Sequence, residues 1–135
     1  MRVVAGEVCG VQGPVTDIAA DPLYLDVQIS PGELFVQPIP EGYTALAYLY
    51  HGKCEFVGSQ VVEAVRMIAL SDGDHLKVQT ASDSPAHFML VAGAPFREPI
   101  VPYGPFVMNT VEEIQQTLEE LRNGTFVSEA QPPAP

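Results

Sequence analysis

Residues 23–29 read LYLDVQI, and the alternation of side chains in this stretch decides the fold class that the chain predicts. Successive side chains of an extended strand point to opposite sides, so every second residue falls on one face. Here that face is wholly apolar and consists of Leu23, Leu25, Val27 and Ile29. The stretch therefore predicts a β-strand with one buried face.

Turn residues divide the rest of the chain into further short apolar runs. Pro and Gly supply 13 and 11 of the 135 residues, more than an all-helical protein carries. Strands are expected at residues 34–36, 43–50, 53–57, 66–70, 73–80 and 86–92. His51-Gly52 predicts a turn between two of these strands, and Asp72-Gly73 predicts a hairpin. Turns spaced by about eight to twelve residues are typical of a β-sandwich or barrel.

One helix is predicted near the end of the chain. Thr110 and Glu113 have the spacing of a capping box, in which each side chain accepts from the other residue's backbone amide. Apolar residues then recur at helical spacing and form one stripe, namely Val111, Ile114, Leu118 and Leu121. Asn123-Gly124 ends the helix. Residues 1–126 are expected to form a single domain, and the Pro-rich residues 127–135 a disordered tail.

The charge of the chain argues against two classes of partner. Seventeen Asp and Glu residues against six Lys and Arg give a formal net charge of −11. A nucleic-acid-binding protein needs a cationic surface that displaces counterions from phosphate, so no nucleic acid is expected as a partner. Anionic membrane surfaces are disfavoured for the same reason, and the apolar run at residues 45–50 is too short to span a bilayer.

Motifs for catalysis or secretion are missing from the sequence. The start has no continuous apolar signal segment, and Cys9 and Cys54 are expected to be free thiols in a reducing compartment, so a cytoplasmic location is expected. No serine lies in a GxSxG motif. His51, His75 and His87 share no metal-binding spacing. No catalytic residue and no cofactor is therefore predicted.

The segment EPIVPYGPFVMNT at residues 98–110 resembles the closing signature of the pirin family, and the following helix resembles the one that ends pirins. Shorter matches precede it in the same order, at residues 3–7, 13–14, 24–26, 40–42 and 90–93. A pirin normally contains two cupin β-barrels, and this chain resembles the C-terminal one. The resemblance implies an all-β, cupin-type double-stranded β-helix barrel, jelly-roll-like, with one C-terminal α-helix.

The resemblance also implies that the barrel has lost its metal site. The first cupin motif lies between two glycines, which match Gly32 and Gly52, and contains two histidines and a glutamate as ligands. By that spacing the ligand places are Pro38, Pro40 and Ala45. These side chains have no lone pairs to offer a metal ion. In pirins the metal site belongs to the N-terminal barrel, so no metal is expected here.

If Ala45 points into the barrel, strand alternation places its neighbours on the same inner face. His87 is the candidate nearest to the histidine place of the second cupin motif. The predicted cavity residues are therefore Tyr43, Ala47, Leu49, His51 and His87. The small alanines leave room either for a ligand or for a bulky neighbour such as Phe88 or Met89. Close packing of protein interiors favours the filled core.

Three functions stay open on this sequence. A second barrel without the first would expose the apolar patch that its partner covers, so a homodimer or a complex with a partner cupin domain is expected. The candidate interface is the helix stripe Val111, Ile114, Leu118 and Leu121. The favoured function is a non-catalytic module that acts through such association. The alternatives are a small-ligand-binding barrel and a metal-dependent, quercetin-type dioxygenase that works together with a partner barrel.

Overall fold

The structure is a computed structural model that describes residues 1–58 and 60–127. The chain divides into two compact units, one at residues 1–96 and one from residue 97 onwards, and each is described by itself. The predicted disordered tail lies outside the described residues, except for Val127. That the chain forms a single domain stays a prediction.

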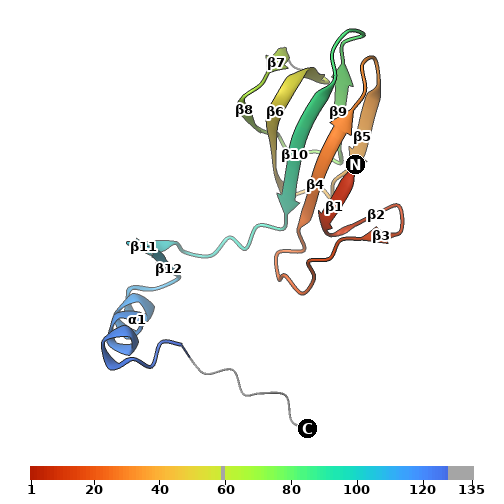
Figure 1. The fold of residues 1–135 in the computed structure, drawn as a ribbon. Helices are drawn as coiled ribbons and strands as arrows, with labels where there is room; N and C mark the ends of the chain where they lie inside the picture. Colours follow the sequence, from red (N-terminus) through yellow and green to blue (C-terminus); the bar gives the residue numbers. More distant parts are fainter. Residues whose placement is uncertain (59, 128–135) are drawn as a thin grey trace. The chain divides into compact units, whose positions relative to one another are not determined.

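An antiparallel sheet of eight strands makes up the first unit and curls upon itself (Figure 1). Six strands follow each other in the order β1-β4-β10-β6-β9-β5, and β7 and β8 also pair with β6. Their bounds are β1 (Arg2–Ala5), β4 (Leu23–Ile29), β5 (Leu34–Pro38), β6 (Thr44–Phe56), β7 (Val61–Glu63), β8 (Arg66–Ala69), β9 (His75–Thr80) and β10 (Ala86–Gly93). A separate ladder joins β2 (Glu7–Val8) to β3 (Val11–Gln12). The prediction of an all-β fold is confirmed.

The long strand β6 allows the sheet to curl. Its first part pairs with β10 and β8, and its last part pairs with β7 and β9. The predicted turn at His51-Gly52 is wrong, because β6 runs through both residues without a break. Gly52 instead has a left-handed φ of 79° inside the strand. A positive φ of this kind is typical of a β-bulge, which bends a strand without ending it.

The register between β6 and β10 shifts at this place. His51 lies opposite His87, but Leu49 lies opposite Phe88, so Tyr50 is an extra residue on β6. An extra residue reverses the in–out alternation of the strand. In β6, the buried residues accordingly have odd numbers up to Leu49 and even numbers at Cys54 and Phe56.

The predicted hairpin at Asp72-Gly73 is also wrong. This turn joins β8 to β9, but both strands pair with β6, at residues 46–49 and 54–56 respectively. The Asp72 carboxylate accepts hydrogen bonds from the backbone amides of Gly42 (2.9 Å) and Gly73 (3.1 Å). The hydrogen bonds of a tight turn are therefore present at Asp72, but β8 and β9 pair with the long strand β6 and not with each other.

The core of the first unit lies inside the curled sheet. The alternating residues of β4 identified in the sequence are all buried, and Leu25 is 0% exposed. Phe88 of β10 is also 0% exposed. Its ring packs in edge-to-face geometry with the rings of Phe35 and Phe56, at centroid distances of 5.8 and 6.0 Å. Three aromatic rings from different strands thus meet in the interior.

The second unit consists of a small hairpin and the predicted helix. The hairpin pairs β11 (Val101–Tyr103) with β12 (Phe106–Met108). The helix α1 (Val111–Asn123) begins at the capping box of Thr110 and Glu113 and ends at Gly124, whose φ is 71°. The prediction of this helix and of both its ends is confirmed.

The apolar stripe of α1 is only partly covered within its own unit. The helix packs against β11 and β12, which buries Ile114 and half-buries Leu118. Val111 and Leu121 stay 52% and 43% exposed. In the part of the chain that the structure describes, no helix has the length and hydropathy needed to cross a membrane.

Candidate functional site

The ligand places counted from the cupin spacing lie where β5 ends and β6 begins. Pro38 and Pro40 are exposed, whereas Ala45 is buried. Because side chains alternate along an extended segment, the inward-facing residues beside the prolines are Gln37 and Ile39, each 7% exposed. The cupin spacing assigns the two prolines to inward-facing ligand places. In the structure they face outward instead.

The inward-facing residues do not supply the donors of a cupin metal site. Gln37 contributes one amide, whose Nε2 donates to the carbonyl oxygen of Pro38 at 2.9 Å. Ile39 and Ala45 contribute hydrocarbon, which has no lone pair for a metal ion. Across residues 1–58 and 60–127, no group of three or more His, Cys, Asp and Glu residues is placed to hold an ion.

Two of the five predicted cavity residues belong to the packed core. Ala47 and Leu49 are both 0% exposed. Leu90 lies opposite Ala47, and Phe88 lies opposite Leu49. Large apolar side chains of β10 therefore occupy the space beside the small residue of β6. Met89, the other candidate for filling this space, lies on the opposite face of β10.

His51 and His87, also predicted to line the cavity, lie on the outer face of the sheet instead. His51 is exposed and His87 is half-buried. Their ring centroids are 4.8 Å apart, with 38° between the ring planes. Simple alternation from Ala45 places His51 inside, but the extra residue at Tyr50 reverses the direction of the side chains that follow. Gly52 is the signal in the sequence that could have suggested this bulge, because a glycine inside a strand often marks one.

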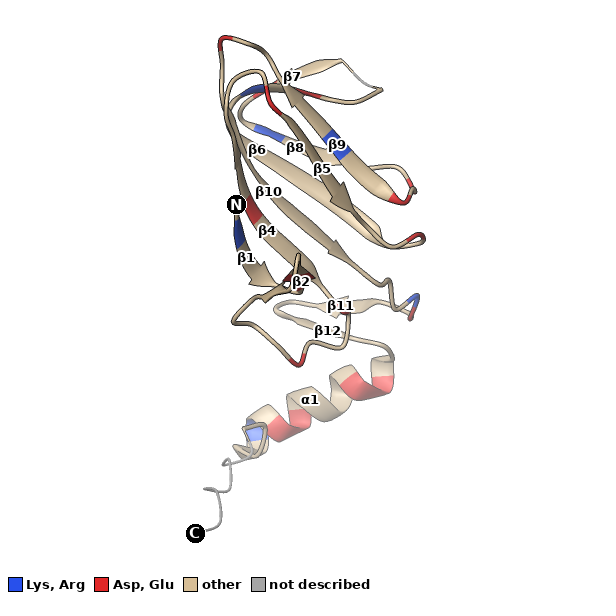
Figure 2. Cartoon of the chain, turned by 90° about the vertical axis from the view of Figure 1, so that its right-hand side faces the viewer, with Lys and Arg blue, Asp and Glu red and all other residues tan. Residues whose placement is uncertain are grey.

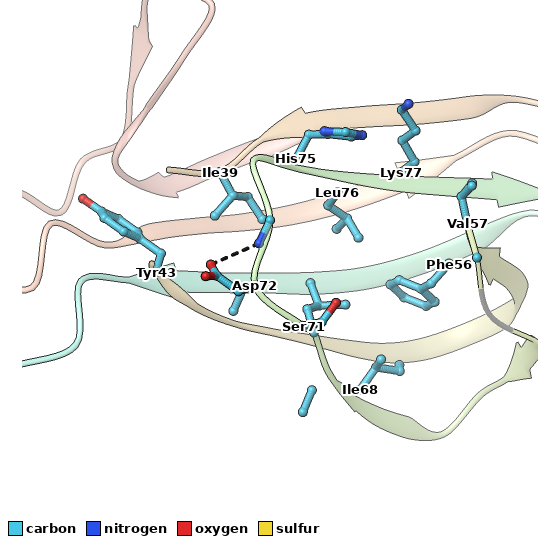
Figure 3. Close-up of a pocket in the computed structure, with 15 residues that line it drawn as sticks. Ile39, Tyr43, Phe56, Val57, Ile68, Ser71, Asp72, His75, Leu76 and Lys77 are labelled. Carbon is cyan, nitrogen blue, oxygen red and sulfur yellow. Dashed lines mark hydrogen bonds between the residues drawn. The ribbon is translucent and has the colours of Figure 1, made fainter. Parts of the chain in front are cut away.

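Tyr43, the fifth predicted residue, borders a cavity of about 270 Å³ in the first unit (Figure 3). Its buried walls are apolar and include Ile39, Ala45, Phe56 and Leu76. Its exposed rim is polar and includes Ser71, Asp72, His75 and Lys77. The cavity thus combines apolar walls with a polar opening, which is typical of sites for small molecules.

Three of the polar side chains around this cavity are engaged with their neighbours. The Tyr43 hydroxyl donates to Oδ2 of Asp21 at 2.6 Å, and this hydrogen bond raises the pKa of Tyr43. The Nδ1 atom of His75 contacts Oδ1 of Asp74, and this hydrogen bond lowers the pKa of Asp74. As described above, Asp72 holds two backbone amides. These contacts fix the loops of the rim.

The two cysteines are free thiols, as predicted. Cys54 is buried in β6, and burial raises the pKa of its thiol to about 11. Because the thiolate is the nucleophilic form, this raised pKa disfavours reaction of Cys54 at neutral pH. Cys9 is exposed. The buried thiol therefore acts as a small apolar core residue.

An apolar surface covers the outside of β4, β10, β6 and β8. It was not predicted from the sequence. It forms two rows across the strands, and we call it the tyrosine–methionine face: Tyr24, Val91 and Leu46 in the first row, and Met89, Tyr48 and Met67 in the second. In Figure 2, β10 has no charged residue along its length.

The tyrosine–methionine face is accessible within the first unit. Met67 is 60% exposed, Val91 43% and Leu46 39%. The hydroxyl of Tyr24 lies 3.3 Å from the sulfur of Met89, to which it donates a hydrogen bond. The signal in the sequence is the apolar character of outward positions such as Leu46 and Val91, which strand alternation assigns to solvent.

Comparisons with known proteins agree with this fold. The family model described as the pirin C-terminal cupin domain matches residues 24–127. The chain is 38% identical to human pirin over 127 residues, which cover 91% of this chain and 43% of that protein. It is 37% identical to a putative quercetin 2,3-dioxygenase of Pseudomonas aeruginosa over 124 residues, which cover 90% of this chain and 41% of that protein.

A solved structure has a similar fold. The crystal structure of quercetin 2,3-dioxygenase from Acinetobacter baumannii matches with a TM-score of 0.80 and 29% identity. The match covers 95% of this chain and 44% of that one. The chain therefore spans less than half the length of these relatives.

Proposed function

The chain belongs to the pirin family as a C-terminal cupin domain, and from this premise we propose that it is a non-catalytic module that acts by pairing with a second copy of itself. The expected cupin-type fold is confirmed by the family match and the solved structure. The observation that carries the proposal is the tyrosine–methionine face. Three of its six residues are exposed and none of the six is charged, on a chain whose formal net charge is −11.

The composition of this face supports an interface. The cores of protein interfaces are enriched in Tyr and Met and depleted in charged residues. Asp26 lies at one end of the second row, opposite Met89, and its Oδ1 accepts a hydrogen bond from the Tyr50 hydroxyl at 2.7 Å. Its carboxylate is thus already paired within the sheet. An exposed apolar patch of this kind marks an interaction site.

The negative charge of the chain favours the tyrosine–methionine face, rather than other surfaces, as the contact between two copies. Two chains that each have a charge of −11 repel one another over most of their surface. The repulsion is weakest where neutral faces meet. A two-fold axis through the tyrosine–methionine face would bury the same patch on both copies, which is the geometry of most homodimers. A partner cupin domain and the helix stripe of Val111 and Leu121 are the competing interfaces, and the experiment below separates them.

We expect the purified chain to have twice its 14.5 kDa mass in size-exclusion chromatography with light scattering at micromolar concentration. Met67→Glu and Val91→Glu should each give monomers, because an acidic side chain would be buried beside its symmetry mate. Juxtaposed like charges cost several kcal/mol, so the dissociation constant should rise at least about 100-fold.

Two control variants test which surface is used. Val107→Glu changes a valine that is 62% exposed in the hairpin of the second unit, and it should leave the dimer intact. Val111→Glu changes the helix stripe. Dissociation by Val111→Glu and not by Met67→Glu would assign the interface to the helix. A wild-type monomer of 14.5 kDa would reject self-association and leave the partner cupin domain as the associating chain.

A small-ligand-binding barrel is the second candidate, and the cavity of about 270 Å³ favours it. A ligand that binds only the folded state raises the melting temperature. We expect apolar fragments with one polar group to give such a shift in a thermal-shift screen. Ile68→Trp, at a half-buried wall position, should remove the shift by filling the cavity. Val61→Trp changes an exposed residue and is the matched control, and equal shifts in both variants would place the ligand elsewhere.

Dioxygenase activity with a partner barrel is not the function we favour. The name quercetin 2,3-dioxygenase belongs to relatives of which this chain covers 41% and 44%. At the counted ligand place Ala45, and at the inward-facing Gln37 and Ile39 beside the two prolines, the side chains do not provide the imidazole and carboxylate donors of the cupin motif. The residues present therefore do not fit the metal that such a reaction uses in cupins.

A further inference from the structure

Two histidines from neighbouring strands face each other on the outside of the sheet. His51 of β6 and His87 of β10 are direct partners in the register, and their ring centroids are 4.8 Å apart. From this geometry we propose that His51 and His87 form a two-imidazole binding site for a divalent transition-metal ion such as Ni²⁺ or Zn²⁺. The site lies on the face of the sheet opposite to the barrel interior, so it is distinct from the cupin ligand places.

The distance between the rings fits a shared ion. An imidazole nitrogen binds zinc at about 2.0–2.1 Å, which places the ring centre about 3.2 Å from the metal. Two rings that subtend an angle of about 90–110° at the ion therefore have centres about 4.5–5.2 Å apart. The observed separation of 4.8 Å lies inside this interval. Because the χ2 torsion of histidine is broad, one nitrogen of each ring can turn towards a common point.

The surrounding sheet holds the pair in place. β10 pairs with β4 on one side and β6 on the other, so the backbone of His87 is fixed from both directions. The ring of Tyr50 contacts the ring of His87 at 5.9 Å, and the Tyr50 hydroxyl is fixed by Asp26. A pre-arranged pair of ligands loses little freedom when it binds an ion.

The chemistry of the pair indicates the class of ion and the strength of the site. Neutral imidazole suits Zn²⁺, Cu²⁺ and Ni²⁺, whereas Mg²⁺ and Ca²⁺ prefer oxygen ligands. His51 is exposed, so an ion can reach the pair from solvent. The net charge of −11 attracts cations to the chain. The described residues provide no group of three or more His, Cys, Asp and Glu ligands, so water fills the other positions and binding is weaker than in a closed structural site.

Calorimetric titration of the purified 135-residue chain with Ni²⁺ tests the proposal. We expect one ion per chain, with His51→Ala and His87→Ala each lowering the affinity at least about tenfold because the second ligand no longer acts at high effective concentration. His75→Ala removes the third histidine, which contacts Asp74 in another part of the sheet, and should leave the affinity unchanged. Paramagnetic broadening by Ni²⁺ should centre on the ring signals of His51 and His87 in NMR spectra.

Several results would overturn the proposal. One is a wild-type chain that binds no Ni²⁺ at millimolar concentration, and another is unchanged affinity in the double variant of His51 and His87. Loss of binding in His75→Ala or in Cys9→Ser, with both other histidines in place, would assign the ion to a different donor. His51 is exposed, so its replacement is expected to leave the fold intact, and a loss of binding in that variant then reports on the ligand alone.

Discussion

Gly52→Ala is expected to destabilise the first unit far more than Gly42→Ala, although the two glycines have almost the same backbone conformation. Their φ angles are 79° and 81°. A residue with a Cβ loses about 1–2 kcal/mol in this left-handed region, and this loss is common to both positions. The space around them differs. A Cβ on Gly52 would lie 1.9 Å from the carbonyl oxygen of Pro85, whereas nothing lies within 4 Å of one on Gly42.

The clash at Gly52 involves backbone that cannot turn aside as a flexible side chain can. Pro85 immediately precedes Ala86, the residue of β10 that pairs with Gly52. Relief of the clash would separate β6 from β10 at the bulge and disturb the adjacent pair of His51 and His87. We therefore expect Gly42→Ala to lower the free energy of unfolding by about 1–2 kcal/mol. Gly52→Ala should lower it by about 4 kcal/mol or more.

Urea denaturation followed by circular dichroism measures both values, because the midpoint and the slope give the free energy of unfolding. Equal losses in the two variants would contradict the argument. They would mean that the carbonyl group of Pro85 moves away from position 52 without disturbing the pairing of the strands.

The elements that the sequence predicted well are those with a local physical cause. The strand at residues 23–29 follows from its alternation, and α1 follows from its capping box and its terminal glycine. Each signal lies within the element that it describes. No knowledge of distant partners is needed to interpret it.

The elements that were predicted wrongly depend on distant pairing. Asp72-Gly73 has the chemistry of a hairpin turn, but β8 and β9 both join β6. The direction of His51 depends on how β6 and β10 align at the bulge, since one extra residue turns the following side chains to the other face. Pairing across the sheet decides both features, and neither residue contains information about its partner strand.

The geometry of the candidate site could not be predicted from the sequence. The ligand places were counted between Gly32 and Gly52, and in the structure the two prolines of this segment face outward whereas Gln37 and Ile39 face inward. A count along the sequence does not fix the phase of alternation in a segment that contains two prolines. The tyrosine–methionine face was missed because it is assembled from four strands that are far apart in the sequence.

Phe88→Ala is expected to have the other large effect, because Phe88 fills the interior of the curled sheet. Its side chain is 0% exposed and contacts the rings of Phe35 and Phe56. Truncation of a buried phenylalanine removes its burial and leaves a cavity, at a cost of about 3–5 kcal/mol. Since domains of this size have a stability of about 5–15 kcal/mol, the loss should be a large part of the total.

Phe96→Ala is the matched control for Phe88→Ala. It removes the same atoms from a side chain that is 60% exposed at the end of the first unit, and its effect should stay within about 0.5 kcal/mol.

The cavity left by Phe88→Ala also provides a direct test of how the barrel is filled. An apolar cavity of this kind stays dry and binds small aromatic molecules, so benzene should raise the melting temperature of the variant and leave that of the wild type unchanged. A loss below about 1 kcal/mol, with no effect of benzene, would mean that the interior collapses around the missing ring or already contains water. The barrel would then not be a filled core, and the case for a small-ligand site would gain over the case for a module that acts through its outer face.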